Sequence, residues 1–227
     1  MTIRICVSIL PSNIDEALSL IGKAEKHKPD FIEVRLDCIK QHEKLADIRG
    51  CTKTPLIATN RTQECQGKFS GSEAERRQIL LKAARSGFEY VDIELHASKL
   101  REFVGSLRQL NVKPIISFHD FNQTPSQQKM KEVLERELAE GAEICKIVTT
   151  AKKVGDNLTV LKFLHKASGK AKVVCFAMGP MGKPSRLLSP LFGGFFTIAS
   201  LEHGGETAPG QMTIQELRTA YQALGAQ

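Results

Sequence analysis

One lysine stands inside an otherwise apolar segment of the sequence. Residues 142–150 read AEICKIVTT, a β-branched run that predicts a buried strand with Lys146 near its centre. Burial disfavours the charged ammonium and lowers its pKa, and a neutral amine is a nucleophile. Most lysines in strands instead carry their ammonium groups into solvent at an edge. The hypothesis that Lys146 is reactive therefore depends on its neighbours in the fold.

Polar side chains alternate with apolar ones in the neighbouring strand candidates. Residues two apart share one face of a strand, so each candidate presents its polar side chains together. The polar faces carry Glu33, Arg35 and Asp37; Thr59 and Arg61; Asp92 and Glu94; Ser117 and His119; and Lys146. An amine, an imidazole, carboxylates and guanidinium groups around one cavity suit Schiff-base chemistry on a carbonyl substrate that is also an anion. A histidine ordinarily titrates near neutral pH, which makes His119 the candidate base.

The elements that must position these side chains alternate along the whole chain. Strand candidates cover residues 3–9, 31–37, 56–61, 90–95, 114–119, 144–149, 172–178 and 195–200. Helix candidates lie near 14–27, 41–49, 72–86, 98–110, 126–140, 156–168, 184–190 and 213–224. Eight consecutive βα units in 227 residues predict a (β/α)8 TIM barrel, with residues 1–227 forming a single catalytic domain.

The polar strand faces of such a barrel line its interior, because the outer faces pack against helices. Burying many ionisable groups is costly unless they pair or perform chemistry. Most of them also fall late in their strands, toward the C-terminal mouth where barrel active sites form. This placement favours a catalytic Lys146 over a solvent-facing one.

The composition argues against membrane and nucleic-acid binding. No apolar run reaches the length of a membrane span, and no signal-type segment opens the chain, which predicts a cytoplasmic protein. The formal charge of +7 is spread along the chain, and the densest basic clusters have no aromatic residues among them. With no tryptophan and only two tyrosines, a module that binds single-stranded nucleic acid is not expected. A cationic pocket for an anionic small molecule fits this charge as well.

The six cysteines show no metal-binding spacing. They include no C-x-x-C pair and no nearby histidine at zinc-site spacing, so we expect no metal site. Cys6, Cys145 and Cys175 lie in apolar runs, where a cysteine behaves as a small buried hydrophobe. Reduced thiols are the simplest prediction.

Seven short motifs follow one another along the chain. They are EVRLD (33–37), ATNRT (58–62), YVDIEL (90–95), SFHDF (117–121), CKI (145–147), PSR (184–186) and APGQ (208–211). In this order the chain resembles the type I 3-dehydroquinate dehydratase family over essentially its full length. The resemblance implies a TIM-barrel lyase of the shikimate pathway and aromatic amino acid biosynthesis, which dehydrates 3-dehydroquinate to 3-dehydroshikimate. It also implies a homodimer that uses neither metal nor dissociable cofactor.

The resemblance implies roles for individual residues. Lys146 matches the Schiff-base lysine of the family, and His119 matches its general acid/base, which removes a proton and helps the hydroxyl leave. Glu33, Arg35 and Arg61 match positions that contact the substrate.

Other matches concern the substrate carboxylate and the lid. Arg186 matches the arginine that binds the carboxylate, a role that suits a bidentate guanidinium. Met178 matches an apolar wall, for which ordinary core packing is the alternative. Gln211 and Thr207, in the loop HGGETAPGQ, match a closing lid, and the alternative is a solvated Gly-rich turn.

The sequence departs from the family in the loop after the third strand. The family often has R-x-x-x-E-G-G there, with a glutamate that assists the histidine, whereas this chain reads RTQECQGKF. Cys65 stands at the glutamate position and Glu64 precedes it. Either Glu64 substitutes through a shifted turn, or the helper is absent.

Two other functions fit a lysine-containing barrel. One is a class I aldolase, which would bind a substrate phosphate at Gly204 and Gly205. The other is a non-catalytic barrel used for binding, which would have no need of Lys146. The Arg186 and APGQ motifs favour a substrate carboxylate over a phosphate.

Overall fold

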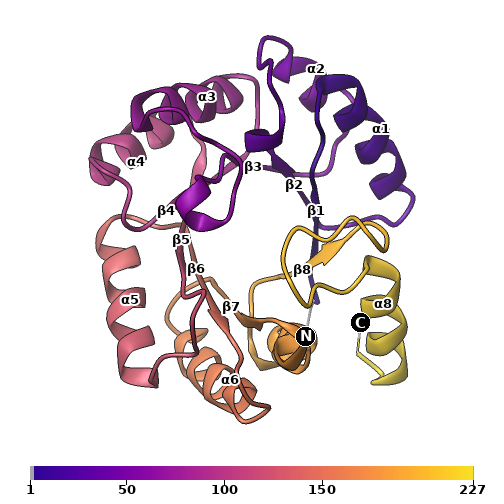
Figure 1. The fold of residues 1–227 in the computed structure, drawn as a ribbon, viewed down its shortest axis with the longest axis vertical. Helices are drawn as coiled ribbons and strands as arrows, with labels where there is room; N and C mark the ends of the chain where they lie inside the picture. The colour runs from indigo at the N-terminus through magenta and orange to yellow at the C-terminus, as the bar shows by residue number, and fades with distance from the viewer. Residues whose placement is uncertain (1–2, 227) are drawn as a thin grey trace.

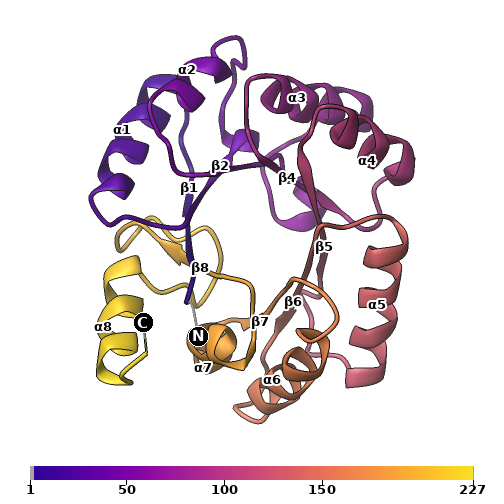
Figure 2. The ribbon, with the colours of Figure 1, turned by 180° about the vertical axis from the view of Figure 1, so that it is seen from behind.

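Eight strands form the centre of the molecule, and helices surround them (Figures 1 and 2). The computed structural model describes residues 3–226. The strands are β1 (Ile5–Ile9), β2 (Phe31–Arg35), β3 (Leu56–Thr59), β4 (Tyr90–Glu94), β5 (Lys113–His119), β6 (Ile144–Thr150), β7 (Val173–Met178) and β8 (Thr197–Ser200). Each strand agrees with a predicted one to within two residues at either end.

One helix follows each strand. The helices are α1 (Ile14–Glu25), α2 (Leu45–Gly50), α3 (Glu73–Arg85), α4 (Leu100–Gln109), α5 (Gln127–Ala139), α6 (Asp156–Ala167), α7 (Lys183–Leu188) and α8 (Ile214–Ala223). Ser72 and Thr213 form capping boxes at the starts of α3 and α8. Gly87 and Gly141 adopt positive φ angles just after α3 and α5, where L-residues are strained.

All neighbouring strands in the sheet are parallel, in the order β8, β1, β2, β3, β4, β5, β6, β7. Between β7 and β8 no strand ladder forms, although the amide of Phe195 donates to the carbonyl of Val173 at 2.8 Å. The sheet is therefore a nearly closed (β/α)8 barrel, and the predicted fold class is confirmed.

Two predicted strands end early. β2 stops at Arg35, followed by a 3-10 turn over Leu36–Cys38, and β3 stops at Thr59. The Asp37 carboxylate accepts hydrogen bonds from the backbone amides of Arg61, at 3.1 Å, and Lys68, at 3.0 Å. Because these amides bind a side chain instead of a neighbouring strand, the backbone leaves the sheet as a loop.

The barrel interior is apolar toward the N-terminal ends of the strands and polar toward their C-terminal ends. Phe31, Ile57, Tyr90, Ile115, Ile144, Val174 and Phe196 belong to one buried cluster inside the barrel. A second, larger cluster joins the outward strand faces to the helices. The polar side chains predicted to point inward lie above the apolar half, toward the C-terminal ends of the strands. The apolar half fills the base of the cavity and excludes water from it.

Two further features concern the cysteines and the helices. All six cysteines are free, and Cys6, Cys145 and Cys175 are buried. No helix within residues 3–226 has the length and hydropathy required to cross a bilayer.

Candidate active site

All nine residues predicted for catalysis and binding line one cavity at the C-terminal mouth of the barrel. They are Glu33, Arg35, Arg61, His119, Lys146, Met178, Arg186, Thr207 and Gln211. Four strands, α7 and the loops after β3 and β8 contribute them. In Figure 1 both of these loops extend over the centre of the ring. The side chains that the sequence analysis singled out therefore lie around one cavity.

Lys146 is buried and paired with two carboxylates. Its Nζ lies 2.7 Å from Asp92 Oδ2 and 3.5 Å from Glu33 Oε1, and the residue is 5% exposed. Desolvation lowers the pKa of Lys146, but the negative charges of Asp92 and Glu33 outweigh it and leave the pKa above its usual value. The expectation of a lowered pKa is therefore wrong for the resting site, where Lys146 is an ammonium ion.

His119 lies beside the lysine on the neighbouring strand. Ser117 pairs with Lys146 in the β5–β6 ladder, so His119 lies two residues further toward the mouth. Its ring stacks on Phe121 at 5.6 Å, and its buried Nδ1 has no partner among the described residues. Desolvation, together with the positive charges of Arg61 and Lys146, holds the pKa of His119 well below its usual value. The imidazole is neutral and can accept a proton.

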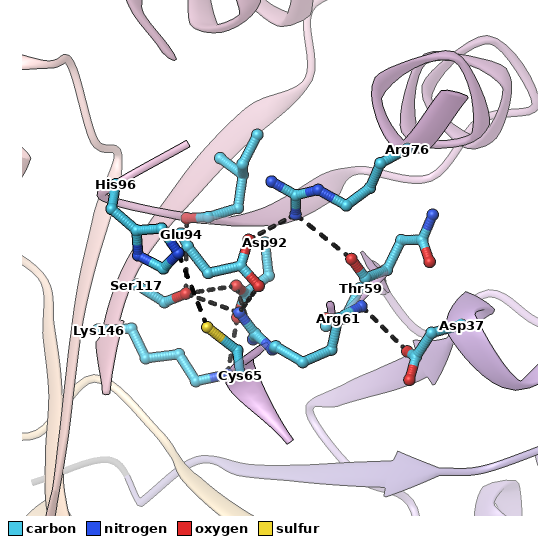
Figure 3. Close-up of polar contacts among 12 residues, drawn as sticks. Asp37, Thr59, Arg61, Cys65, Arg76, Asp92, Glu94, His96, Ser117 and Lys146 are labelled. Carbon is cyan, nitrogen blue, oxygen red and sulfur yellow. Dashed lines mark hydrogen bonds and ion pairs between the residues drawn. The ribbon is translucent and has the colours of Figure 1, made fainter. Parts of the chain in front are cut away.

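Arg61 is bound by two carboxylates on β4 (Figure 3). Its guanidinium donates to Asp92 Oδ1 at 2.9 Å, to Glu94 Oε1 at 2.7 Å and to Ser117 Oγ at 3.1 Å. The negative charge of Asp92 is thus shared between Arg61 and Lys146. Desolvation would raise the pKa of Asp92, but the positive charges of Arg61 and Lys146 outweigh this effect and lower it. Asp92 therefore remains ionised.

Arg186 is the cavity cation without an acidic partner. It lies on α7, it is 1% exposed, and its guanidinium carbon is 4.2 Å from the centre of the Phe176 ring. Nη1 donates to the Ile198 carbonyl at 3.1 Å, whereas Nε and Nη2 have no partner within residues 3–226. Burial lowers the pKa of Arg186 to about 10. A buried guanidinium with two free donors has the geometry that suits a carboxylate or another anion.

The loop after β8 is packed against the end of β7. Gln211 Oε1 accepts hydrogen bonds from the Thr207 amide at 2.6 Å and from its hydroxyl at 3.2 Å. The Pro209 carbonyl accepts a hydrogen bond from the Gly179 amide at 3.0 Å. The buried Gln211 Nε2 has no partner among the described residues. The loop therefore covers the cavity with one side-chain donor unused.

Cys65, and not Glu64, lies at the cavity in the loop after β3. The Cys65 thiol is 3.8 Å from His96 Nε2, and burial raises its pKa. Glu64 is exposed and does not line the cavity. Substitution of the family glutamate by Glu64 through a shifted turn is therefore not what the structure shows.

Comparison with known proteins identifies the family. The family model described as type I 3-dehydroquinase matches residues 5–227. The chain belongs to this family. A 3-dehydroquinate dehydratase of Dehalococcoides mccartyi strain BAV1 is 39% identical, over 86% of this chain and 86% of its own length. One from Methanococcus maripaludis strain C7 is 34% identical, over 97% of this chain and all of its own.

A solved structure of the same family has the same fold. It is the type I 3-dehydroquinate dehydratase of Clostridium difficile with covalently modified comenic acid. The TM-score is 0.90 at 26% identity, and the alignment covers 97% of this chain and 92% of the other.

Several residues that shape this dehydroquinase site were not singled out from the sequence. Asp92 and Ser117 lie on the polar strand faces, but strand parity alone does not reveal that Asp92 binds Lys146 and that Ser117 binds Arg61. Phe121 lay inside the SFHDF motif without an assigned role. Phe176 and Arg76 had no sequence signal, because an apolar strand residue and a helical arginine are ordinary features.

Proposed function

We propose that this protein dehydrates 3-dehydroquinate to 3-dehydroshikimate through a Schiff base on Lys146. One observation carries the proposal: a buried amine and a guanidinium with two free donors line the same cavity. A substrate that satisfies both groups has a carbonyl and a carboxylate. Family membership points to the same substrate, and the covalently modified ligand of the Clostridium difficile relative is consistent with covalent catalysis.

In the proposed reaction the Lys146 ammonium first releases one proton to solvent, and the neutral amine then adds to the carbonyl. A proton taken back from solvent lets the hydroxyl of this adduct leave as water, which gives an iminium ion. The iminium withdraws electrons, so His119 removes a proton from the adjacent carbon. The resulting enamine expels the hydroxyl group, which leaves as water after His119 returns the proton. Hydrolysis of the iminium then releases 3-dehydroshikimate and the free amine. The amine itself supplies the electron sink, so the reaction needs neither metal nor dissociable cofactor.

The remaining residues bind and enclose the substrate in this proposal. Arg186 binds the carboxylate through its free Nε and Nη2. Glu33, Arg35 and Arg61 bind hydroxyl groups at the opposite wall, and Met178 supplies an apolar surface.

The loop after β8 closes the proposed site. Gln211 donates its unused Nε2 to the substrate, and Thr207 holds the Gln211 side chain in place. Closure of this loop excludes water from the iminium.

The proposed role places the protein in the shikimate pathway and in aromatic amino acid biosynthesis. Localisation in the cytoplasm and assembly as a homodimer remain predictions. Neither bears on the chemistry, because all nine proposed site residues come from one chain.

Trapping with borohydride tests the covalent step. The enzyme is incubated with 3-dehydroquinate and borohydride, digested, and examined by peptide mass spectrometry. We expect one reduced adduct, on the peptide that contains Lys146. His119→Ala should still give the adduct while its turnover falls by about 10²–10⁴-fold, because only the proton transfer is lost.

Other outcomes would overturn the proposal. No adduct, or an adduct on an exposed lysine such as Lys152, would exclude Lys146 as the nucleophile. Activity on a phosphorylated sugar, with none on 3-dehydroquinate, would indicate the aldolase alternative.

A further inference from the structure

Arg76 is a buried cation that does not line the cavity. It lies on α3, outside the barrel, and is 2% exposed. Its Nη1 donates to Glu94 Oε2 at 2.5 Å and to the Asn60 carbonyl at 3.3 Å. Nε and Nη2 donate to the two oxygens of Glu73, at 2.7 and 2.9 Å. Arg76 therefore joins a carboxylate of the outer helix to a carboxylate of the barrel interior.

A line of alternating charges connects Arg76 to Lys146 (Figure 3). Glu94 binds Arg76 through one oxygen and Arg61 through the other. Arg61 binds Glu94 through Nη1 and Asp92 through Nη2. Asp92 binds Arg61 through Oδ1 and Lys146 through Oδ2. Every carboxylate in this line is shared between two cations.

We propose that Arg76 is a positioning residue that controls how strongly Asp92 holds the ammonium of Lys146. This inference rests on the proposed Schiff-base function. Among the described residues, Arg76 is one of the two cations that bind Glu94. Because Arg76 neutralises part of Glu94, Arg61 binds Glu94 through Nη1 alone and keeps Nη2 for Asp92. Because Arg61 neutralises part of Asp92, the carboxylate does not bind the Lys146 ammonium with its full charge.

Removal of Arg76 should stabilise the ammonium form of Lys146 through two effects. Glu94 would then draw Arg61 toward itself, and Asp92 would turn its charge to Lys146. Loss of a buried cation from the same network also favours the ammonium directly. Both effects keep Lys146 protonated to higher pH and slow its attack on the carbonyl.

Titratable and charged groups lie around both ends of this line, and each can influence a pH profile. Lys146 is faced by Asp92, Glu33, Arg61, Arg35, His119 and Cys6. Arg76 is faced by Glu73, Glu94 and the Cys65 thiol. None of these groups is changed in the variants described below.

The test is the pH dependence of kcat/KM for wild type, Arg76→Met, Arg76→Lys and Arg77→Met. Arg77→Met is the matched control: it removes the same charge from the same helix, but among residues 3–226 the Arg77 guanidinium binds only Glu73 and Ser98. For Arg76→Met we expect the rise of kcat/KM to move to higher pH by about one pH unit. At neutral pH the kcat/KM of Arg76→Met should therefore be lower than that of wild type, and the two values should become equal at alkaline pH. The pH profile of Arg76→Lys should lie between those of wild type and Arg76→Met, because lysine keeps the positive charge but not the bidentate guanidinium. The profile of Arg77→Met should match wild type.

Circular dichroism and thermal unfolding show whether each variant folds. If Arg76→Met does not fold, Arg76→Lys carries the test, and a shift in the same direction supports the inference. A folded Arg76 variant with the wild-type pH profile and only a lower Tm would overturn it. Borohydride trapping on the wild type keeps the two proposals apart: an adduct on Lys146 with an unshifted Arg76 profile contradicts only this inference.

Discussion

The Lys146 ammonium is paired with two carboxylates, although the strand that carries it is otherwise largely apolar. Its amine is pre-positioned by Asp92 at 2.7 Å and Glu33 at 3.5 Å, and Glu33 is fixed in turn by hydroxyls of Ser8 and Thr59. Strand parity predicted that these polar groups share a cavity. It did not predict the pairing, because distances across a barrel depend on strand register. The direction of the lysine pKa was mispredicted for this reason.

Substitution of Lys146 separates its chemical role from its electrostatic role. Lys146→Met should abolish turnover and lower the free energy of unfolding by about 3–5 kcal/mol, because Asp92 and Glu33 lose a buried cation. Lys146→Arg should also abolish turnover but destabilise less, since it keeps a positive charge. Steady-state assays and urea unfolding measure the two effects. A Lys146→Met variant with near-normal activity would exclude the nucleophile role, and one as stable as wild type would exclude the electrostatic role.

At the level of elements, strands were more predictable than loops. Alternating patterns in β2, β4, β5 and β6 identified which face of each strand points inward. The loop after β3 was less predictable, since it folds back through a bridge between Thr62 and Phe69 and through the close approach of Gly67 to Arg61. These contacts place Cys65 at the cavity, and no local sequence pattern specifies them.

The loop after β8 allows a matched test of lid closure. Gly210 and Gly204 both have positive φ, but a Cβ at Gly210 would lie 2.2 Å from the Gly179 carbonyl oxygen, whereas one at Gly204 meets nothing within 4 Å. Gly210→Ala should therefore undock the loop and raise KM for 3-dehydroquinate by about tenfold or more. Gly204→Ala introduces the same backbone strain without the clash and should raise KM much less. Equal KM values in the two variants would show that loop docking does not contribute to binding.

At the level of the whole molecule, one buried acid opposes folding. Glu137 on α5 is fully buried, and neither carboxylate oxygen has a partner within residues 3–226. Burial raises the pKa of Glu137 well above its usual value, with a smaller contribution from the charge of Asp92. The folded state therefore holds a proton that the unfolded chain releases near pH 4.3. Stability from this group is full below that pH and is lost as pH rises toward the folded-state pKa.

Glu137→Met should stabilise the protein at neutral pH. We expect a gain of about 1–3 kcal/mol, because the substitution removes a buried polar group without partners and keeps a similar volume. The gain should shrink on acidification toward the pKa of the unfolded carboxyl group. Glu135→Met, on the exposed side of the same helix, is the control and should change stability by less than about 0.5 kcal/mol. Urea unfolding at several pH values measures both, and a destabilised Glu137→Met would contradict the assignment.

The gap between β7 and β8 admits an arginine from outside the barrel. Because the two strands share no ladder, the Ile198 carbonyl is free to bind Arg186 of α7, and the Thr197 hydroxyl donates to the Arg186 carbonyl at 2.8 Å. The group proposed to recognise the substrate anion thus belongs to a different layer from the amine and the imidazole. Under the proposed function, mutations in α7 would alter which acid is accepted while Lys146 and His119 stay unchanged. In evolutionary terms, substrate specificity could then change through α7 while the reactive groups on β5 and β6 are kept.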